Sequence, residues 1–111
     1  MSYKVVVRAG PRFERATTDS LDEALAYLER KAGELGGRRA AAVDVLGKRY
    51  EPEQRVIARI ELKGPSARGG VDIRGDGSIA AWTGGFVRRP LQTDAPFDAL
   101  REQLGDPRSD L

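Results

Sequence analysis

The dipeptide Asp76-Gly77 constrains the fold of this 111-residue chain more than any other feature. A two-residue type I′ hairpin turn needs positive φ at both central residues, a conformation that Asp tolerates and Gly adopts freely. Folding the flanking segments back about this turn pairs Ile73 with Ala80 and Val71 with Trp82. All four side chains then lie on one face. The sequence therefore predicts a core hairpin with Trp82 turned inward.

Other segments have the composition or alternation of strands. Residues 3–9 alternate apolar and basic side chains, and residues 12–17 contain few apolar residues, which predicts an edge strand. Residues 39–50 are interpreted as a strand through Val43 and Val45, although three alanines there favour a helix. Residues 55–63 alternate most clearly, with an inward set predicted to be Val56, Ala58, Ile60 and Leu62.

Two amphipathic helices are also predicted. Ser20 and Glu23 form a capping box, and the apolar residues that follow recur at helical spacing until Gly36-Gly37. A shorter helix would have Thr93 or Asp94 as its cap and Pro96 in its first turn. Its buried stripe is predicted to be Phe97, Leu100 and Leu104.

These elements predict an α+β fold, with an antiparallel sheet of about five to six strands and two helices packed on one face, in the order β-β-α-β-β-β-β-α. Residues 1–105 are predicted to form a single domain, and residues 106–111 a frayed tail. The predicted core contains Leu25, Leu28, Val56, Ile60, Leu62, Val71, Ile73, Trp82, Phe97 and Leu100.

The composition of the chain excludes many kinds of catalysis and metal binding. The chain has no cysteine and no histidine, and so lacks thiolate nucleophiles and the commonest general base and metal ligand. Its scattered carboxylates show no apolar surroundings that would tune a pKa. We therefore expect no catalysis, no metal and no cofactor. No apolar run approaches the roughly 20 residues that span a bilayer, which predicts a soluble cytoplasmic protein without a membrane partner.

The distribution of charged residues is the remaining indication of function. The predicted helices expose mostly acidic side chains, whereas the strands carry most of the arginines and lysines. Such segregation is typical of a protein that contacts a phosphate backbone, although basic outer strands also prevent sheet aggregation. We expect a non-catalytic module that binds nucleic acid through a basic sheet face. The candidate contacts are Arg8, Arg12, Arg15, Lys48, Arg49, Arg55, Arg59, Lys63, Arg88 and Arg89.

The same face has a second interpretation. Val6, Ile57 and Ile79 are predicted to point outward among arginines, and an apolar centre with an arginine-rich rim is typical of a subunit interface. A homodimer or another protein partner is therefore the alternative to nucleic acid. With Trp82 and Phe86 turned inward, the sheet would lack the exposed aromatic residues of RNA-recognition sheets.

Residues 3–35 resemble the arm-type DNA-binding domains of tyrosine recombinases. The matching run is VVVRAGPRFERATTDSLDEALAYLER, which covers under a third of the chain. The resemblance implies that basic strands placed before a helix contact DNA. The third strand expected before the helix in that family is missing here.

Overall fold

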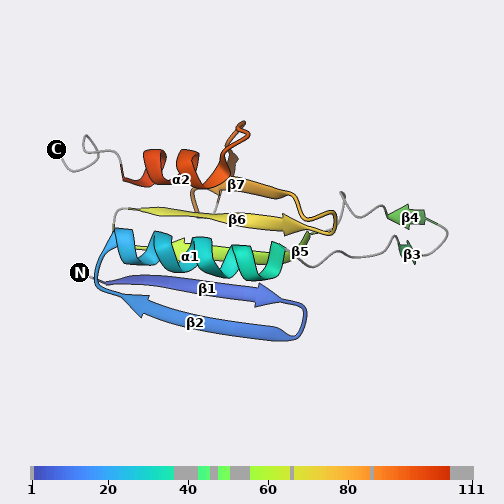
Figure 1. Cartoon of the computed structure of the whole chain (residues 1–111), viewed down its shortest axis with the longest axis horizontal. Coiled ribbons are helices and arrows are strands. Elements are labelled where there is room, and N and C mark those ends of the chain that lie inside the picture. Colours follow the sequence, from blue (N-terminus) through green and yellow to red (C-terminus); the bar gives the residue numbers. More distant parts are fainter. Residues whose placement is uncertain are drawn as a thin grey trace.

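Six strands form one antiparallel sheet (Figure 1). They are β1 (Tyr3–Ala9), β2 (Arg12–Thr18), β5 (Val56–Lys63), β6 (Arg68–Arg74), β7 (Ile79–Thr83) and β8 (Arg89–Pro90), in the spatial order β2-β1-β5-β6-β7-β8. This structure is a computed structural model that describes residues 2–36, 43–45, 48–50, 56–65, 67–85 and 87–105. The predicted tail, residues 106–111, lies outside the described residues.

Two helices, α1 (Leu21–Gly36) and α2 (Pro96–Leu104), cover the same face of the sheet (Figure 1). Helix α1 packs on β1, β5 and β6, and α2 packs on β6 and β7. The Ser20 hydroxyl accepts the Glu23 backbone N–H at 3.1 Å, which is the serine half of the predicted capping box. The predicted α+β fold, with its element order and its two helices on one face, is confirmed.

The start of α2 differs from the prediction. Its cap position is Ala95, not Thr93 or Asp94, and no side chain caps the helix. The Thr93 hydroxyl instead accepts the Ala95 N–H at 3.0 Å, before the helix begins. Pro96 then occupies the first turn, where its missing N–H costs no hydrogen bond.

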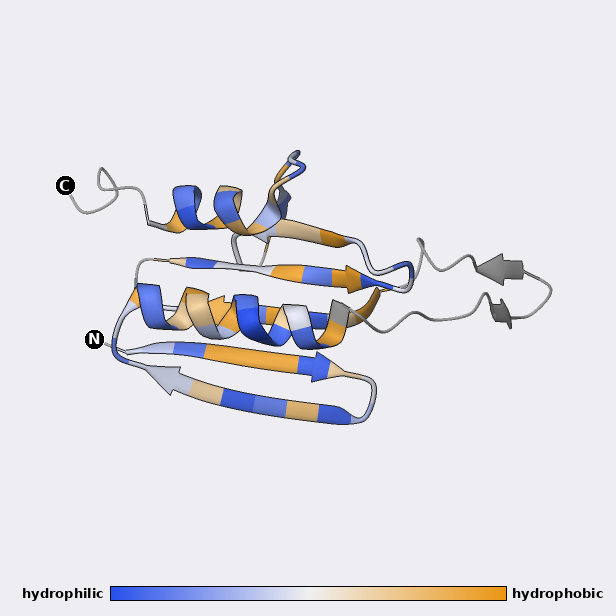
Figure 2. Cartoon of the chain, in the orientation of Figure 1, coloured by the Kyte–Doolittle hydropathy of each residue, from blue (hydrophilic) through white to orange (hydrophobic). Residues whose placement is uncertain are grey.

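The layer between the sheet and the helices holds the hydrophobic core. Strand β1 contributes a continuous hydrophobic run, while edge strand β2 is mostly polar, with Phe13 and Ala16 as its apolar residues (Figure 2). Of the predicted core residues, Leu25, Leu28, Ile60, Leu62, Val71, Ile73 and Leu100 are buried in one cluster, and Phe97 packs against it half-buried. At ~25 cal/mol per Å² of apolar area removed from water, this cluster supplies the main stabilising term.

A separate two-stranded sheet consists of β3 (Val43–Val45) and β4 (Lys48–Tyr50). Val43 and Val45 lie in a strand, as predicted, but the described part of residues 39–50 forms two strands and not one. These two strands pair with each other and do not join the main sheet. Figure 1 shows this hairpin beyond the end of the six-stranded sheet.

The hairpin of β6 and β7 has a different register from the predicted one. Ile73 pairs with Ile79 and Val71 with Ala81, so the strands are shifted by one residue. The loop contains three residues, Gly75 to Gly77, because the Gly77 N–H bonds to the Arg74 carbonyl and the Arg74 N–H bonds to the Ser78 carbonyl, both at 2.9 Å. Gly77 has φ of 90°, the left-handed residue that such a loop requires.

This one-residue shift moves Trp82 out of the core. Side chains alternate along a strand, so the observed register places Trp82 beside Asp72 on the face away from the helices. Trp82 is still only 5% exposed, and the Arg88 guanidinium lies over its ring. A hydrogen bond gives a physical reason for this placement: the indole Nε1 donates to Asp72, whereas an apolar core would leave it without an acceptor.

One other predicted position needs correction. Val56 is 46% exposed because an irregularity between Val56 and Ala58 interrupts the alternation of β5. Gly84-Gly85 belong to the connection between β7 and β8, and the positive φ of Gly84 turns the chain there. The prediction for Phe86 falls on a residue outside the described ranges.

Candidate nucleic-acid interface

The sheet face away from α1 and α2, called the open face below, is rich in cations. The strand register and side-chain contacts place there Lys4, Arg8, Arg15, Arg59, Lys63, Arg68 and Arg88. The carboxylates that the strands add to the same face are Glu61 and Asp72. The open face is therefore positively charged, even after its ion pairs are counted.

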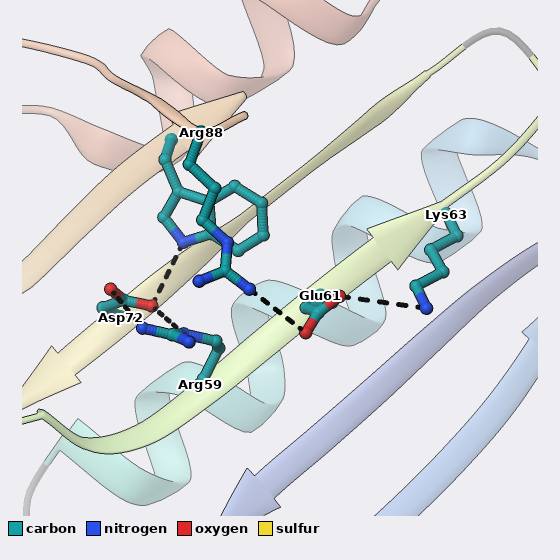
Figure 3. Close-up of polar contacts among 6 residues, drawn as sticks. Arg59, Glu61, Lys63, Asp72 and Arg88 are labelled. Atoms are coloured by element: carbon teal, nitrogen blue, oxygen red, sulfur yellow. Dashed lines mark hydrogen bonds and ion pairs between the residues drawn. The ribbon is translucent and has the colours of Figure 1, made fainter. Parts of the chain in front are cut away.

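Asp72 joins two of its neighbours on the open face. Arg59 donates to it through Nε at 2.8 Å and through Nη2 at 3.2 Å, and the Trp82 indole donates at 3.1 Å (Figure 3). The hydrogen bond with Asp72 raises the pKa of Arg59 above its ordinary value. The bidentate contact fixes Arg59 and neutralises its charge, and the separate indole hydrogen bond fixes Trp82 on the same face.

A second group of contacts surrounds Glu61. Its carboxylate lies 3.6 Å from Arg88 Nη2 and 3.9 Å from Lys63 Nζ (Figure 3). The Arg88 guanidinium also lies over the Trp82 ring, with its Cζ 4.6 Å from the ring centroid. Arg88 therefore covers Trp82 through a cation–π contact, and one carboxylate is shared by two cations.

An arginine–aromatic stack lies at the edge of the open face. Phe13 on β2 is 51% exposed, and the guanidinium carbons of Arg8 and Arg15 lie 5.4 and 5.3 Å from its ring centroid. Within the described residues, neither arginine forms an ion pair with a carboxylate. The stack thus offers planar groups and two uncompensated charges to solvent.

The ten predicted nucleic-acid contacts fall into different places. Arg8, Arg15, Arg59, Lys63 and Arg88 come together on the open face. Arg12 lies on the other face of β2, 3.4 Å from Glu14, and Arg89 pairs with Thr83, which puts it on the face opposite Trp82. Lys48 and Arg49 belong to the separate β3–β4 hairpin, and Arg55 lies outside the described residues.

The predicted apolar interface does not assemble on the open face. Val6 points there but is only 5% exposed. Ile79 lies opposite Ile73 and packs on the core, and Ile57, next to the β5 irregularity, also packs on it. The outward placement of Ile79 is wrong for the same reason as that of Trp82, because the hairpin register differs by one residue.

The opposite side of the molecule is more acidic. Helix α1 exposes Asp22, Glu23, Glu29 and Glu34, and its Lys31 is paired with Glu14 and Glu34 at 3.4 and 3.5 Å. On α2, Arg101 is paired with Asp22 at 3.3 Å. The predicted division into a basic strand face and an acidic helix side is present in the structure.

Three members of the open face, Lys4, Phe13 and Arg68, are missing from the predicted contacts. Phe13 belongs to a strand predicted only as an edge, and Arg68 directly precedes the glycines that begin the β6 hairpin. Lys63 and Arg68 flank the short connection between β5 and β6, so a hairpin register could have paired them. Only the long-range pairing of β1 with β5 could have placed Lys4 beside Lys63.

Protein-family models, curated proteins and solved structures offer no match to this chain. The resemblance to arm-type domains therefore gains no support, and the third main-sheet strand, β5, follows α1. None of the described helices is long and apolar enough to cross a bilayer.

Proposed function

We propose that this protein is a non-catalytic module that binds nucleic acid on the open face of its sheet. The observation that carries the proposal is the cluster of open-face cations without acidic partners among the described residues, Lys4, Arg8, Arg15 and Arg68. Unpaired Lys and Arg on one face are what phosphate-backbone binding uses, because each neutralised phosphate releases counterions.

The division of charge supports the same proposal. An acidic helix side and a basic sheet face would orient the molecule with its sheet toward a polyanion. Folding alone does not require such a division. The paired cations Arg59 and Arg88 add less to long-range attraction, because Asp72 and Glu61 compensate them.

Phe13 favours a single strand over a duplex. Single-strand binders combine a basic surface with aromatic or arginine planes on which unpaired bases stack. Phe13 is half-exposed between Arg8 and Arg15, so a base could stack on the ring or on either guanidinium. The bases of a duplex are already stacked on one another and would not use these groups.

A chemical reaction is not part of the proposal. No group of three or more carboxylates gathers among the residues that the structure describes, and the carboxylates of the open face, Glu61 and Asp72, are engaged by cations. The open face thus offers hydrogen-bond donors, positive charge and planar side chains, which are the groups that a binding protein uses.

A titration with matched variants tests the proposal. One variant carries Arg8→Gln, Arg15→Gln and Arg68→Gln on the open face. Its control carries Arg12→Gln, Arg30→Gln and Arg101→Gln, which removes the same charge elsewhere. Fluorescence anisotropy with random single-stranded and duplex oligonucleotides at ~50 mM salt should show the tighter complex with the single strand.

The open-face variant should bind more weakly and lose ~0.7 unit of salt-dependence slope for each lost contact with a single strand. The control should retain nearly the wild-type slope. If both variants bind like wild type, the open face is not the interface. If wild type binds neither oligonucleotide but scatters light as a dimer, the protein alternative replaces nucleic acid.

A further inference from the structure

Three cations lie side by side at one end of the open face. Lys4 on β1 is directly opposite Lys63 on β5, and Lys63 is directly opposite Arg68 on β6. Neighbouring strands are ~4.8 Å apart, so the three side chains begin within ~10 Å of one another.

This arrangement is unfavourable without an anion. Like charges directly opposite each other destabilise a pair of strands. The described residues provide no ion pair for Lys4 or Arg68, and Lys63 has only Glu61, at 3.9 Å. Glu61 is itself shared with Arg88 at 3.6 Å. The row therefore keeps most of its positive charge.

A hollow of about 240 Å³ opens over this row. Its lining residues are Ser2, Lys4, Thr17, Lys63, Gly64 and Arg68, and Thr17 continues the row because it pairs with Lys4. Ammonium, guanidinium and hydroxyl groups are all hydrogen-bond donors, and no carboxylate belongs to the lining. A tetrahedral oxyanion matches this set of donors.

We propose that this hollow, the phosphate site, binds a phosphomonoester. A monoester carries a charge of about −1.5 to −2 at neutral pH with three acceptor oxygens, which suits a row of three neighbouring cations. A phosphodiester inside a strand carries one negative charge and needs fewer cations. The inference rests on the proposed function in one respect: under that function, the monoester is the terminal phosphate of the bound strand.

The position of the phosphate site fits the end of a strand. Lys4 and Arg8 are four residues apart on β1, a distance of ~13 Å along the sheet, and Arg8 stacks on Phe13. A nucleic-acid strand anchored by its terminal phosphate at the hollow could then lie along β1 and reach the Phe13 stack with a base a few nucleotides away.

Oligonucleotides of one sequence test this proposal. Single strands that carry a 5′-phosphate, a 3′-phosphate or only hydroxyl ends, each labelled away from the varied end, are titrated against the full chain. One phosphorylated form should bind ~10-fold tighter than the hydroxyl form. This ratio should grow between pH 5.5 and 7.5, as the monoester loses its second proton near pH ~6.

Two double variants separate the phosphate site from general attraction. Lys4→Gln with Arg68→Gln should reduce the ratio to about one. Arg8→Gln with Arg15→Gln removes equal charge from the same face and should weaken all three oligonucleotides while the ratio persists. If the Arg8/Arg15 variant also binds the phosphorylated and hydroxyl oligonucleotides equally tightly, no separate phosphate site exists.

The remaining outcomes distinguish this proposal from the proposed function. If oligonucleotides bind and the wild-type ratio is one, the phosphate site is refuted and nucleic-acid binding stands. If oligonucleotides do not bind, but inorganic phosphate or a nucleoside monophosphate binds wild type and not the Lys4/Arg68 variant, the site takes small phosphorylated molecules and the nucleic-acid proposal fails. Binding of neither probe refutes both.

Discussion

Replacing Asp72 with alanine should destabilise the protein and disturb Trp82 at the same time. Asp72 accepts three hydrogen bonds on the open face, two from Arg59 and one from the Trp82 indole. The substitution leaves the guanidinium without its acceptor and the largely buried indole N–H without a partner. Among the described residues, Arg59 and the Trp82 indole have no other hydrogen-bond acceptor.

The expected loss follows from these three bonds. A net hydrogen bond to a charged group contributes ~1.5–3 kcal/mol, and a buried donor left unpaired costs ~1–3 kcal/mol. Arg59 and Asp72 keep 33% and 16% of their side chains exposed, so water screens their ion pair and recovers part of the loss. We expect Asp72→Ala to lower the free energy of unfolding by about 2 kcal/mol.

Urea denaturation monitored by the fluorescence of Trp82, the single tryptophan of the chain, measures both effects. Folded Asp72→Ala should show altered emission, because the indole loses its partner. Glu29→Ala, which removes an exposed carboxylate from α1, should change stability by less than ~0.5 kcal/mol. A double-mutant cycle of Asp72→Ala with Arg59→Ala should give a coupling of about 1 kcal/mol.

A loss below ~0.5 kcal/mol with unchanged emission would refute this reasoning. That result would mean that Trp82 does not meet Asp72. The hairpin would then have the two-residue turn and the register that the Asp76-Gly77 dipeptide by itself predicts, with Trp82 facing the helices.

Three further substitutions test separate parts of the structure. Gly70→Ala should cost ~1–3 kcal/mol in a thermal melt, because its Cβ would contact the Ile60 carbonyl oxygen and lie 2.7 Å from Trp82 Cζ2; a neutral result would place the ring elsewhere. Arg68→Gln should raise stability by ~0.2–1 kcal/mol at low salt by relieving repulsion from Lys63, and a decrease would contradict the unpaired row. Phe13→Ala should keep the melting temperature but weaken single-strand binding by ~1–3 kcal/mol and leave duplex binding unchanged; equal losses for both nucleic acids would exclude base stacking.

Most of the architecture could be predicted from local signals. Alternation marked β1, β5 and the hairpin strands, and the capping box with its leucine stripe marked α1, because each signal lies within one element. The exact register of β6 and β7 was not accessible in this way. Asp-Gly suits both a two-residue turn and a three-residue loop with a left-handed glycine, and the choice reverses every side chain on β7.

The candidate site depends on the register of β6 and β7 and on the pairing of strands that are distant in sequence. Charge patterning identified Arg8, Arg15, Arg59, Lys63 and Arg88, but not which of them are compensated by carboxylates. In the row of Lys4, Lys63 and Arg68, Lys63 and Arg68 flank the short β5–β6 connection, but only the long-range pairing of β1 with β5 brings Lys4 beside them. The irregularity that exposes Val56 likewise has no sequence signal in the alternation of β5.

Arginine side-chain NMR gives the most direct test that the open face binds nucleic acid. The Nε–H signals of Arg8, Arg15 and Arg68 report on that face, and those of Arg12, Arg30 and Arg101 report on the rest of the surface. During a titration with a short single-stranded oligonucleotide at ~50 mM salt, the first three signals should shift and saturate, and the other three should stay in place. Shifts of equal size in both sets, or shifts confined to the second set, would contradict the proposed interface.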